Sequence, residues 1–293
     1  MKTMAFDTQT IETNLFHSDA HSNCFGDCWI SYPIGETRLQ QLNELFSYPD
    51  SVRTPGLLIY GRSNSGKTML VRKFKKDVDD WIEAEYPDTP ASPVQIVETP
   101  PDRPTPKAFY RELLQAIGAP RVESHTSERL LGQVMELYQR NSVQILIVDE
   151  IHNIAAAAPG DQAGFLNVLK YLSNQLNIRV VAVGTEEAYR VLQLDQQLGS
   201  RFRPAELGAW KVNDVAYAKF IFQLIQAAGL QPTKENSSKR FVEFVHALSE
   251  GLTGETKDLI MAAAHAALFQ GKGEIDLPLL ESLAWTPPMM RYR

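Results

Sequence analysis

The sequence has few cysteines, no excess of basic residues and no long apolar run. Only Cys24 and Cys28 occur among its 293 residues. Two cysteines are too few for a disulfide framework and are typical of a reducing cytoplasm. No apolar run approaches the roughly 18 residues that span a bilayer, and the first residues lack the basic and apolar regions of a secretory signal. We therefore expect a cytoplasmic protein with no membrane association.

Basic residues are outnumbered by acidic ones, 29 Lys and Arg against 35 Asp and Glu, for a net charge of −6. This balance argues against a protein coated in basic surface for nucleic acid, although a local basic track remains compatible with it. The charges are segregated along the chain. Residues 61–76 contain six basic residues and no acid, and residues 77–88 contain six acids.

Apolar runs alternate with helix-like stretches over the first 210 residues, and 44% of the chain is hydrophobic. Short continuous apolar runs are typical of strands buried on both faces. They occur at residues 56–60, 94–97, 144–148 and 180–183. Helical patterns occupy residues 35–46, 68–86, 106–117, 127–139 and 162–176. This alternation predicts an α/β fold with a parallel sheet.

The β signal fades after Trp210, and helical patterns follow at residues 213–228, 237–249 and 255–269. Asn213 or Asp214 is expected to cap the first of them. The residues from Thr286 onward are expected to form a loose tail. We therefore predict a helical subdomain after the α/β part.

The strongest motif is the sequence GRSNSGKT at residues 61–68, which fits G-x-x-x-x-G-K-[ST] between an apolar strand and a helix. Such a phosphate loop lets backbone N–H groups and a helix N-terminus bind phosphate oxygens. The lysine reaches the β- and γ-phosphates, and the hydroxyl that follows it binds Mg²⁺. The residues expected to hold ATP here are Gly61, Ser63, Asn64, Ser65, Gly66, Lys67 and Thr68.

A second motif, ILIVDE at residues 145–150, is an apolar strand that ends in two acids. Asp149 is expected to hold Mg²⁺ together with Thr68. Glu150 is placed to polarise the attacking water as a general base. The following residues complete the D-E-x-H pattern of some helicases, but those enzymes need two tandem ATPase cores, and this chain has motifs for one.

Three further positions fit roles around the γ-phosphate. Thr185 ends an apolar strand and is expected to help order the water, although a hydroxyl at a strand end is common. Arg201 is expected to stabilise charge at a neighbouring copy's γ-phosphate, with Arg203 as the alternative. Lys257, which follows a glycine-containing turn at a helix start, is expected to reach the phosphates, although exposed lysines are usually only solvated.

These motifs, in this order, resemble an AAA+ ATPase with a C-terminal helical lid. Three stretches narrow the resemblance to the TniB/TnsC family of transposition regulators: YGRSNSGKT at residues 60–68, VDEIHN at 148–153 and VGTEEA at 183–188. The segment WISYP at residues 29–33 also fits the stretch that leads into the nucleotide pocket there. The resemblance covers residues 29–270. Along the whole chain we expect an N-terminal arm and helix at residues 1–50, an AAA+ core at 51–210, a helical lid at 211–285 and a tail at 286–293.

The resemblance implies a matchmaker rather than a motor. Such proteins assemble with ATP into helical filaments or rings on duplex DNA, recruit a transposase and a target-site selector, and disassemble on weak, partner-stimulated hydrolysis. Some serve CRISPR-associated transposons. The region implied to contact DNA contains Arg103, Lys107 and Thr126. From the residues alone, Lys107 can equally be a solvated lysine and Thr126 a helix N-cap.

Other functions stay open at this point. The chain could be a different AAA+ adaptor, such as a helicase loader or a secretion-type ATPase, or a signalling ATPase without DNA. The N-terminal arm also holds four potential zinc ligands, His17, His21, Cys24 and Cys28. Their spacing is tighter than that of structural zinc sites, and the resemblance implies no zinc, so we expect no metal site there.

Overall fold

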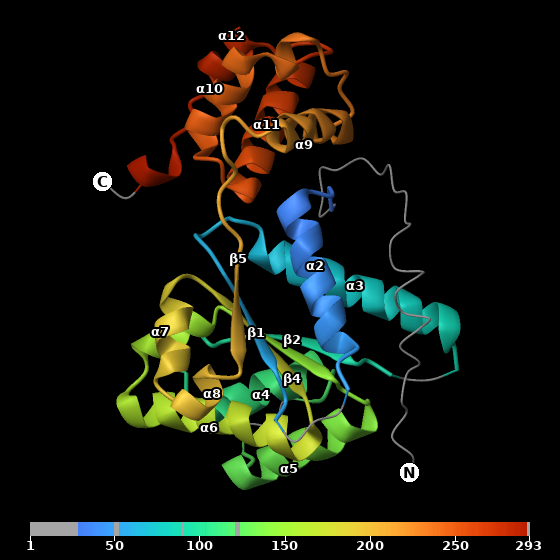
Figure 1. Cartoon of the computed structure of the whole chain (residues 1–293), viewed down its shortest axis with the longest axis vertical. Coiled ribbons are helices and arrows are strands. Elements are labelled where there is room, and N and C mark those ends of the chain that lie inside the picture. Colours follow the sequence, from blue (N-terminus) through green and yellow to red (C-terminus); the bar gives the residue numbers. More distant parts are fainter. Residues whose placement is uncertain (1–28, 50–52, 89–90, 103, 121–123, 292–293) are drawn as a thin grey trace. The chain divides into compact units, whose positions relative to one another are not determined.

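The computed structural model describes residues 29–49, 53–88, 91–102, 104–120 and 124–291 (Figure 1). Their contacts divide them into two compact units, each described by itself below. The sheet unit comprises residues 38–61 and 70–206, and the helical unit comprises residues 29–37, 62–69 and 207–291. Within the described residues, no helix is long and apolar enough to cross a membrane. The domain boundaries expected from the sequence stay a prediction.

The sheet unit is built on five parallel strands in the order β2-β3-β4-β1-β5. The strands are β1 (Gly56–Tyr60), β2 (Val94–Glu98), β3 (Ile145–Asp149), β4 (Arg179–Gly184) and β5 (Phe202–Glu206). The first four are the apolar runs of the sequence, and β3 and β4 are buried along their whole length. The prediction of a parallel α/β sheet is confirmed.

The fifth strand was missed from the sequence. Its residues, FRPAE, carry charge and a proline, and only Ala205 is buried. Strand β5 pairs on one side only, with β1. An edge position tolerates proline because one row of backbone N–H groups faces away from the sheet. No hydrophobic run marks such a strand, so pattern reasoning had no signal for it.

Helices cover both faces of this sheet (Figure 1). Helices α4 (Pro106–Ala116), α5 (Ser127–Arg140) and α6 (Pro159–Leu176) pack on one face, with α7 (Glu187–Gln193) and the one-turn α8 (Gln196–Gly199). Most of α3 (Lys67–Glu85) and of α2 (Pro33–Phe46) lies on the other side. Phe46 of α2 packs edge-on against two aromatic rings of α3, those of Phe74 and Trp81.

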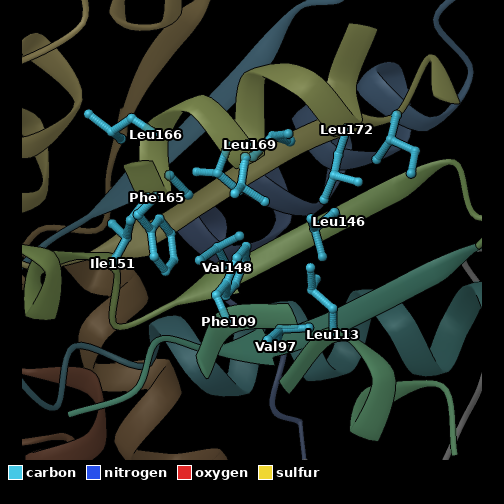
Figure 2. Packing of buried hydrophobic residues seen from close by; sticks show 14 of the residues in the cluster. Val97, Phe109, Leu113, Leu146, Val148, Ile151, Phe165, Leu166, Leu169 and Leu172 are labelled. Atoms are coloured by element: carbon cyan, nitrogen blue, oxygen red, sulfur yellow. The ribbon is translucent and has the colours of Figure 1, made fainter. Parts of the chain in front are cut away.

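The core of the sheet unit lies between β3 and the helices α4 and α6 (Figure 2). Leu146 and Val148 of β3 face Leu169 and Leu172 of α6 and Phe109 of α4. These side chains are all buried, and the rings of Phe109 and Phe165 lie 4.1 Å apart between centroids. This packing fixes the end of β3, where the acidic motif begins.

The helical unit contains α9 (Val215–Ala227), α10 (Lys239–Ser249), α11 (Thr253–Phe269) and α12 (Leu277–Ser282). The predicted cap of α9 is Asp214, whose side chain accepts a hydrogen bond from the N–H of Ala216. Tyr217 is fully buried, and its hydroxyl lies 3.1 Å from that of Ser249 and 3.0 Å from that of Thr256. The predicted helical subdomain is therefore present.

The tail is not loose, contrary to the sequence-based expectation. Residues 288–290 form a short 3-10 turn, and Arg291 pairs with the buried Glu255. The prediction was wrong because the two prolines at 287 and 288 suggested an open chain, whereas the partner of Arg291 lies 36 residues away. Residues 292 and 293 lie outside the described part of the chain.

Candidate nucleotide site

Three parallel strands of the sheet unit end at one edge, where the candidate site residues predicted from the sequence lie. The neighbours β3, β4 and β1 run in the same direction, so Asp149, Thr185 and Gly61 all follow from their carboxyl ends. The N–H of Gly61 donates to the carbonyl of Gly184, 3.2 Å away. In open α/β sheets, ligands bind outside this edge. The predicted residues from these three strands are therefore brought together.

Asp149 is the last residue of β3 and is 6% exposed. Its carboxylate accepts a hydrogen bond from the N–H of Glu150 at 2.8 Å, and its carbonyl accepts one from Thr99 at 2.9 Å. A buried carboxylate is costly unless it is paired or coordinates a cation. Carboxylate and hydroxyl oxygens are ligands that Mg²⁺ prefers, with only one or two carboxylates needed beside substrate phosphates. The buried carboxylate of Asp149 is of the kind that holds such an ion.

Glu150 leaves the strand in a left-handed conformation, with φ 52° and ψ 35°. For a residue other than glycine this backbone is strained, and such strain clusters at functional sites. This conformation turns the chain from β3 into the 3-10 helix η1 (Ile151–Ala156) and leaves the carboxylate partly exposed. The side chain of Glu150 therefore lies outside the strand, directly next to its last residue.

His152 lies beside that carboxylate, with Nε2 3.3 Å from Oε2 of Glu150. The carboxylate only accepts, so Nε2 carries the hydrogen when the pair is bonded. The ring is seated against Gly184 at the end of β4. A Cβ atom on Gly184 would lie 3.1 Å from Nδ1 of His152 and 2.9 Å from Cβ of Ala188. Glycine at 184 therefore leaves the room that the histidine occupies, a link that the sequence analysis missed.

Thr185 is half-buried directly after β4, and its carbonyl accepts a hydrogen bond from the N–H of Ala188 at the start of α7. The residue follows the strand that lies between β1 and β3. Its position at this edge agrees with the sequence prediction, while its role toward a water molecule stays a prediction.

The phosphate loop, residues 61–68, continues from the end of β1, and its residues from Arg62 onward belong to the helical unit. Two of its residues have positive φ, Asn64 at 59° and Gly66 at 94°. Lys67 opens α3 and is 6% exposed, and its Nζ donates to the carbonyl of Arg62 at 2.8 Å. The loop is therefore curled around its own lysine, with Thr68 next in the helix.

The loop is also bound to the start of α11. The N–H of Gly254 donates to the carbonyl of Asn64 at 2.9 Å. The side-chain amide of Asn64 donates to Glu255 at 2.9 Å and to Asp258 at 3.2 Å. Lys257 pairs with Asp258 at 3.9 Å. Acids of this helix, which the sequence analysis passed over in favour of Lys257, thus contact the loop, and the role expected of Lys257 stays a prediction.

Arg201 lies at the amino ends of the strands, opposite to the carboxyl ends where Asp149 and Thr185 lie. It directly precedes β5, whose first residue pairs with Gly56, the first residue of β1. Its guanidinium donates to the side chain of Asn174 at 2.9 Å. The five residues of β1 separate the two edges, about 16 Å at the usual rise of a strand. Arg201 is therefore not brought to Asp149 and Thr185 within one chain.

A surface hollow of about 360 Å³ adjoins Arg201 at this edge and is lined by Arg53, Gln196, Gln197, Ser200 and Arg201. Arg203, the alternative to Arg201, lies within β5 with its side chain exposed. The structure thus separates the two arginines, one in a strand and one before it.

The expected DNA-contacting residues lie on two adjacent helices of the sheet unit. Lys107 is half-buried in the first turn of α4. Thr126 is exposed and caps α5, because its hydroxyl accepts a hydrogen bond from the N–H of Arg129 at 3.3 Å. Arg103 lies outside the described residues. Thr126 therefore has a structural role in any case, and DNA contact by these residues stays a prediction.

The four potential zinc ligands, His17, His21, Cys24 and Cys28, also lie outside the described residues. Within the described ranges, no group of three or more His, Cys, Asp or Glu side chains is placed to hold a metal ion.

Solved structures resemble this fold at low sequence identity. Orc1 of Aeropyrum pernix, solved in complex with DNA, aligns with a TM-score of 0.60 and 14% identity over 87% of this chain and 65% of its own. Cdc6p of Pyrobaculum aerophilum aligns with a TM-score of 0.58 and 17% identity over 87% of this chain and 67% of its own. RuvB of Thermotoga maritima, a Holliday junction branch migration motor, aligns with a TM-score of 0.52 and 13% identity over 84% of this chain and 66% of its own.

The chain thus spans about two thirds of the length of these proteins, and just under two thirds of Orc1. At such identities the likeness establishes the fold alone, which is that of AAA+ P-loop ATPases with a helical C-terminal part. No curated protein matches the sequence. The family model for the bacterial TniB protein matches residues 24–212, about two thirds of the chain. The chain therefore belongs to the TniB family.

Proposed function

We propose that this protein is an ATPase that assembles on duplex DNA with ATP and regulates transposition. The observation that carries the ATPase part is the end of β3, where the buried Asp149 is followed by the strained, partly exposed Glu150. These two acids lie at the sheet edge from which the phosphate loop continues. Family membership supports the transposition part.

In the proposed reaction, the phosphate loop binds ATP through its backbone N–H groups and Lys67 neutralises charge on the β- and γ-phosphates. Thr68 and Asp149 would hold Mg²⁺, which supplies positive charge to the phosphate oxygens. Glu150 accepts a proton from the attacking water while the oxygen of that water bonds to the γ-phosphorus. The bond from that phosphorus to the β-phosphate oxygen breaks, and ADP leaves with that electron pair. Thr185 orients the water.

The proposed site is completed by a second copy of the chain. Since Arg201 lies at the amino edge of its own sheet, it serves the γ-phosphate of a neighbour rather than its own. An arginine supplied in this way increases the hydrolysis rate by about 10³ to 10⁵. This requirement supports a homo-oligomer, a ring or a helical filament, in which an isolated subunit hydrolyses ATP slowly.

The proposed ligand of the assembled form is duplex DNA, with Lys107, Thr126 and Arg103 toward the phosphates. One modest basic contact per subunit, repeated along a filament, gives strong binding by multivalency. This agrees with a net charge of −6, which disfavours tight binding by a lone subunit. The proposed protein partners are a transposase and a target-site selector, and hydrolysis, stimulated by a partner, releases the filament. The few cysteines support a cytoplasmic location.

Electron microscopy of the purified protein with duplex DNA tests this function. With a non-hydrolysable ATP analogue and Mg²⁺ we expect filaments on the DNA, and without nucleotide we expect none. Lys107→Glu should weaken DNA binding and lower its salt dependence by about one phosphate contact or more, with ATP binding retained. Nucleotide binding without any ATP-dependent DNA binding at low salt would instead favour an adaptor or signalling ATPase.

A further inference from the structure

Two acids, Glu250 at the end of α10 and Glu255 in the first turn of α11, each bind the phosphate loop and the C-terminal tail at once. Glu250 pairs with Arg62 of the loop and accepts a hydrogen bond from the N–H of Met289 at 2.7 Å. Glu255 accepts from Asn64 of the loop and from Arg291 of the tail. All of these residues belong to the helical unit. The loop and the tail are therefore joined through two shared carboxylates.

Glu255 is the better buried of the two, with a side chain 5% exposed. Arg291 binds it with two parallel hydrogen bonds, Nη1 to Oε1 at 2.8 Å and Nη2 to Oε2 at 2.6 Å. Burial on its own raises the pKa of Glu255, but the hydrogen bonds from Arg291 and Asn64 outweigh it, and the pKa lies below its ordinary value. The carboxylate is thus ionised at neutral pH and available to hold Asn64.

The loop fits tightly against the helix that carries this acid. A Cβ atom on Gly254 would lie 2.1 Å from the side-chain oxygen of Asn64 and 2.7 Å from its carbonyl oxygen. The N–H of Gly254 donates to that same carbonyl. Asn64 is also one of the two loop residues with positive φ. The left-handed turn of the loop is therefore held by contacts outside the loop.

The tail is positioned to supply Arg291. The Nε of Arg291 donates to the carbonyl of Thr286 at 2.9 Å, and its guanidinium lies 5.4 Å from the ring centre of Trp285. These contacts orient the guanidinium, which matters because two parallel hydrogen bonds to a carboxylate need a fixed geometry. The tail thus presents Arg291 to Glu255 in a defined pose.

We propose that Arg291, acting through Glu255, is a positioning residue for the phosphate loop, and that the tail slows nucleotide release by holding Asn64 in place. This inference rests on the proposed function, since it assumes that the loop binds nucleotide. Removal of the guanidinium leaves Glu255 buried with Asn64 as its remaining partner in this network. The loop then loses its fixed turn, and bound nucleotide escapes more readily.

The test is the dissociation rate of a fluorescent ADP analogue, measured in a stopped-flow chase with excess ADP. Arg291→Ala should release the analogue about tenfold faster than the unaltered chain, as expected for loss of a charge-assisted pair. Arg291→Lys should restore part of the difference. The matched control is Arg240→Ala, which removes an exposed arginine of the same unit that pairs with Glu281 at 3.9 Å. Its release rate should be unchanged.

A double-mutant cycle separates positioning from general loosening. Asn64→Ala and Arg291→Ala should each speed release, but the double variant should be little faster than Asn64→Ala alone, because both act on one contact. Glu255→Gln, which keeps the shape, serves if Arg291→Ala fails to fold.

Release from Arg291→Ala at the unaltered rate, or slower, would overturn the inference, as would additive effects in the cycle. Failure of the proposed function has a different signature, because the unaltered chain would then bind no nucleotide analogue at all.

Discussion

The two units hold their candidate residues in place by different means. In the sheet unit, Asp149 and Gly184 end strands that are buried along their length, and backbone hydrogen bonds to neighbouring strands fix them. In the helical unit, the phosphate loop is held by side chains, above all Asn64 bound to Glu255. Backbone hydrogen bonds between strands hold the site residues rigidly, whereas contacts between side chains can be adjusted or released.

The largest expected effect comes from the loop lysine. Lys67→Ala removes the buried ammonium that is proposed to neutralise the phosphates, and should weaken ATP binding by about a hundredfold or more. A fluorescent ATP analogue, titrated at constant Mg²⁺, measures the change. Lys239→Ala is the control, since that lysine is exposed in the same unit. Equal affinity of Lys67→Ala and the control for the ATP analogue would show that the phosphate loop does not bind the nucleotide.

The next effect concerns the sheet edge and hydrolysis alone. Glu150→Gln keeps the size of the side chain but cannot accept the water's proton, so the hydrolysis rate should fall by about a hundredfold or more. ATP and DNA binding should persist and leave stable filaments. Phosphate release and microscopy measure both, with Glu128→Gln on α5 as control. Normal turnover by Glu150→Gln would show that another group is the base.

A smaller effect should follow from filling the space beside His152. Gly184→Ala places a methyl group against Ala188 and the ring of His152, and such overpacking costs about 1–3 kcal/mol. The hydrolysis rate should also fall as Glu150 loses its neighbour. Gly132→Ala, at an exposed position of α5 with nothing within 4 Å of the new atom, should instead stabilise slightly. Denaturant unfolding compares the two, and equal stabilities would mean that the edge is not rigid.

The smallest expected effect is a change of stability with pH that arises from Glu255 in the helical unit. The folded-state pKa of Glu255 lies below the ordinary value of 4.5, so its ionised form contributes stability above that value, and the contribution is lost as pH falls through the lower folded pKa. The free energy of unfolding of the unaltered chain should exceed that of Glu255→Gln by about 1 kcal/mol at neutral pH.

That difference should shrink in acid below about pH 4. Denaturant titrations of both proteins at neutral and acid pH measure it. A difference that grows in acid would contradict the assignment of Glu255 as an ionised partner of Arg291.

The sequence was sufficient for the parts that local pattern determines. Strands β1 to β4 coincide with the short apolar runs of the sequence, and the phosphate loop and the acids at the end of β3 are short motifs within one stretch of chain. It was insufficient for β5, whose edge position removes the hydrophobic signal. Nor could it find Glu255, because its partners Asn64 and Arg291 lie 191 and 36 residues away. Such pairs exist only after the chain folds.

In the proposed assembly, the nucleotide site of one copy is completed by Arg201 of the next copy. The most direct measurement mixes two inactive variants and follows phosphate release. Arg201→Ala can bind ATP but supplies no arginine, and Lys67→Ala supplies Arg201 but binds ATP more weakly, by about a hundredfold or more. Hydrolysis, absent from each variant alone, should return in the mixture on duplex DNA. No hydrolysis at any mixing ratio, with both variants assembled on the DNA, would contradict a site shared between two copies.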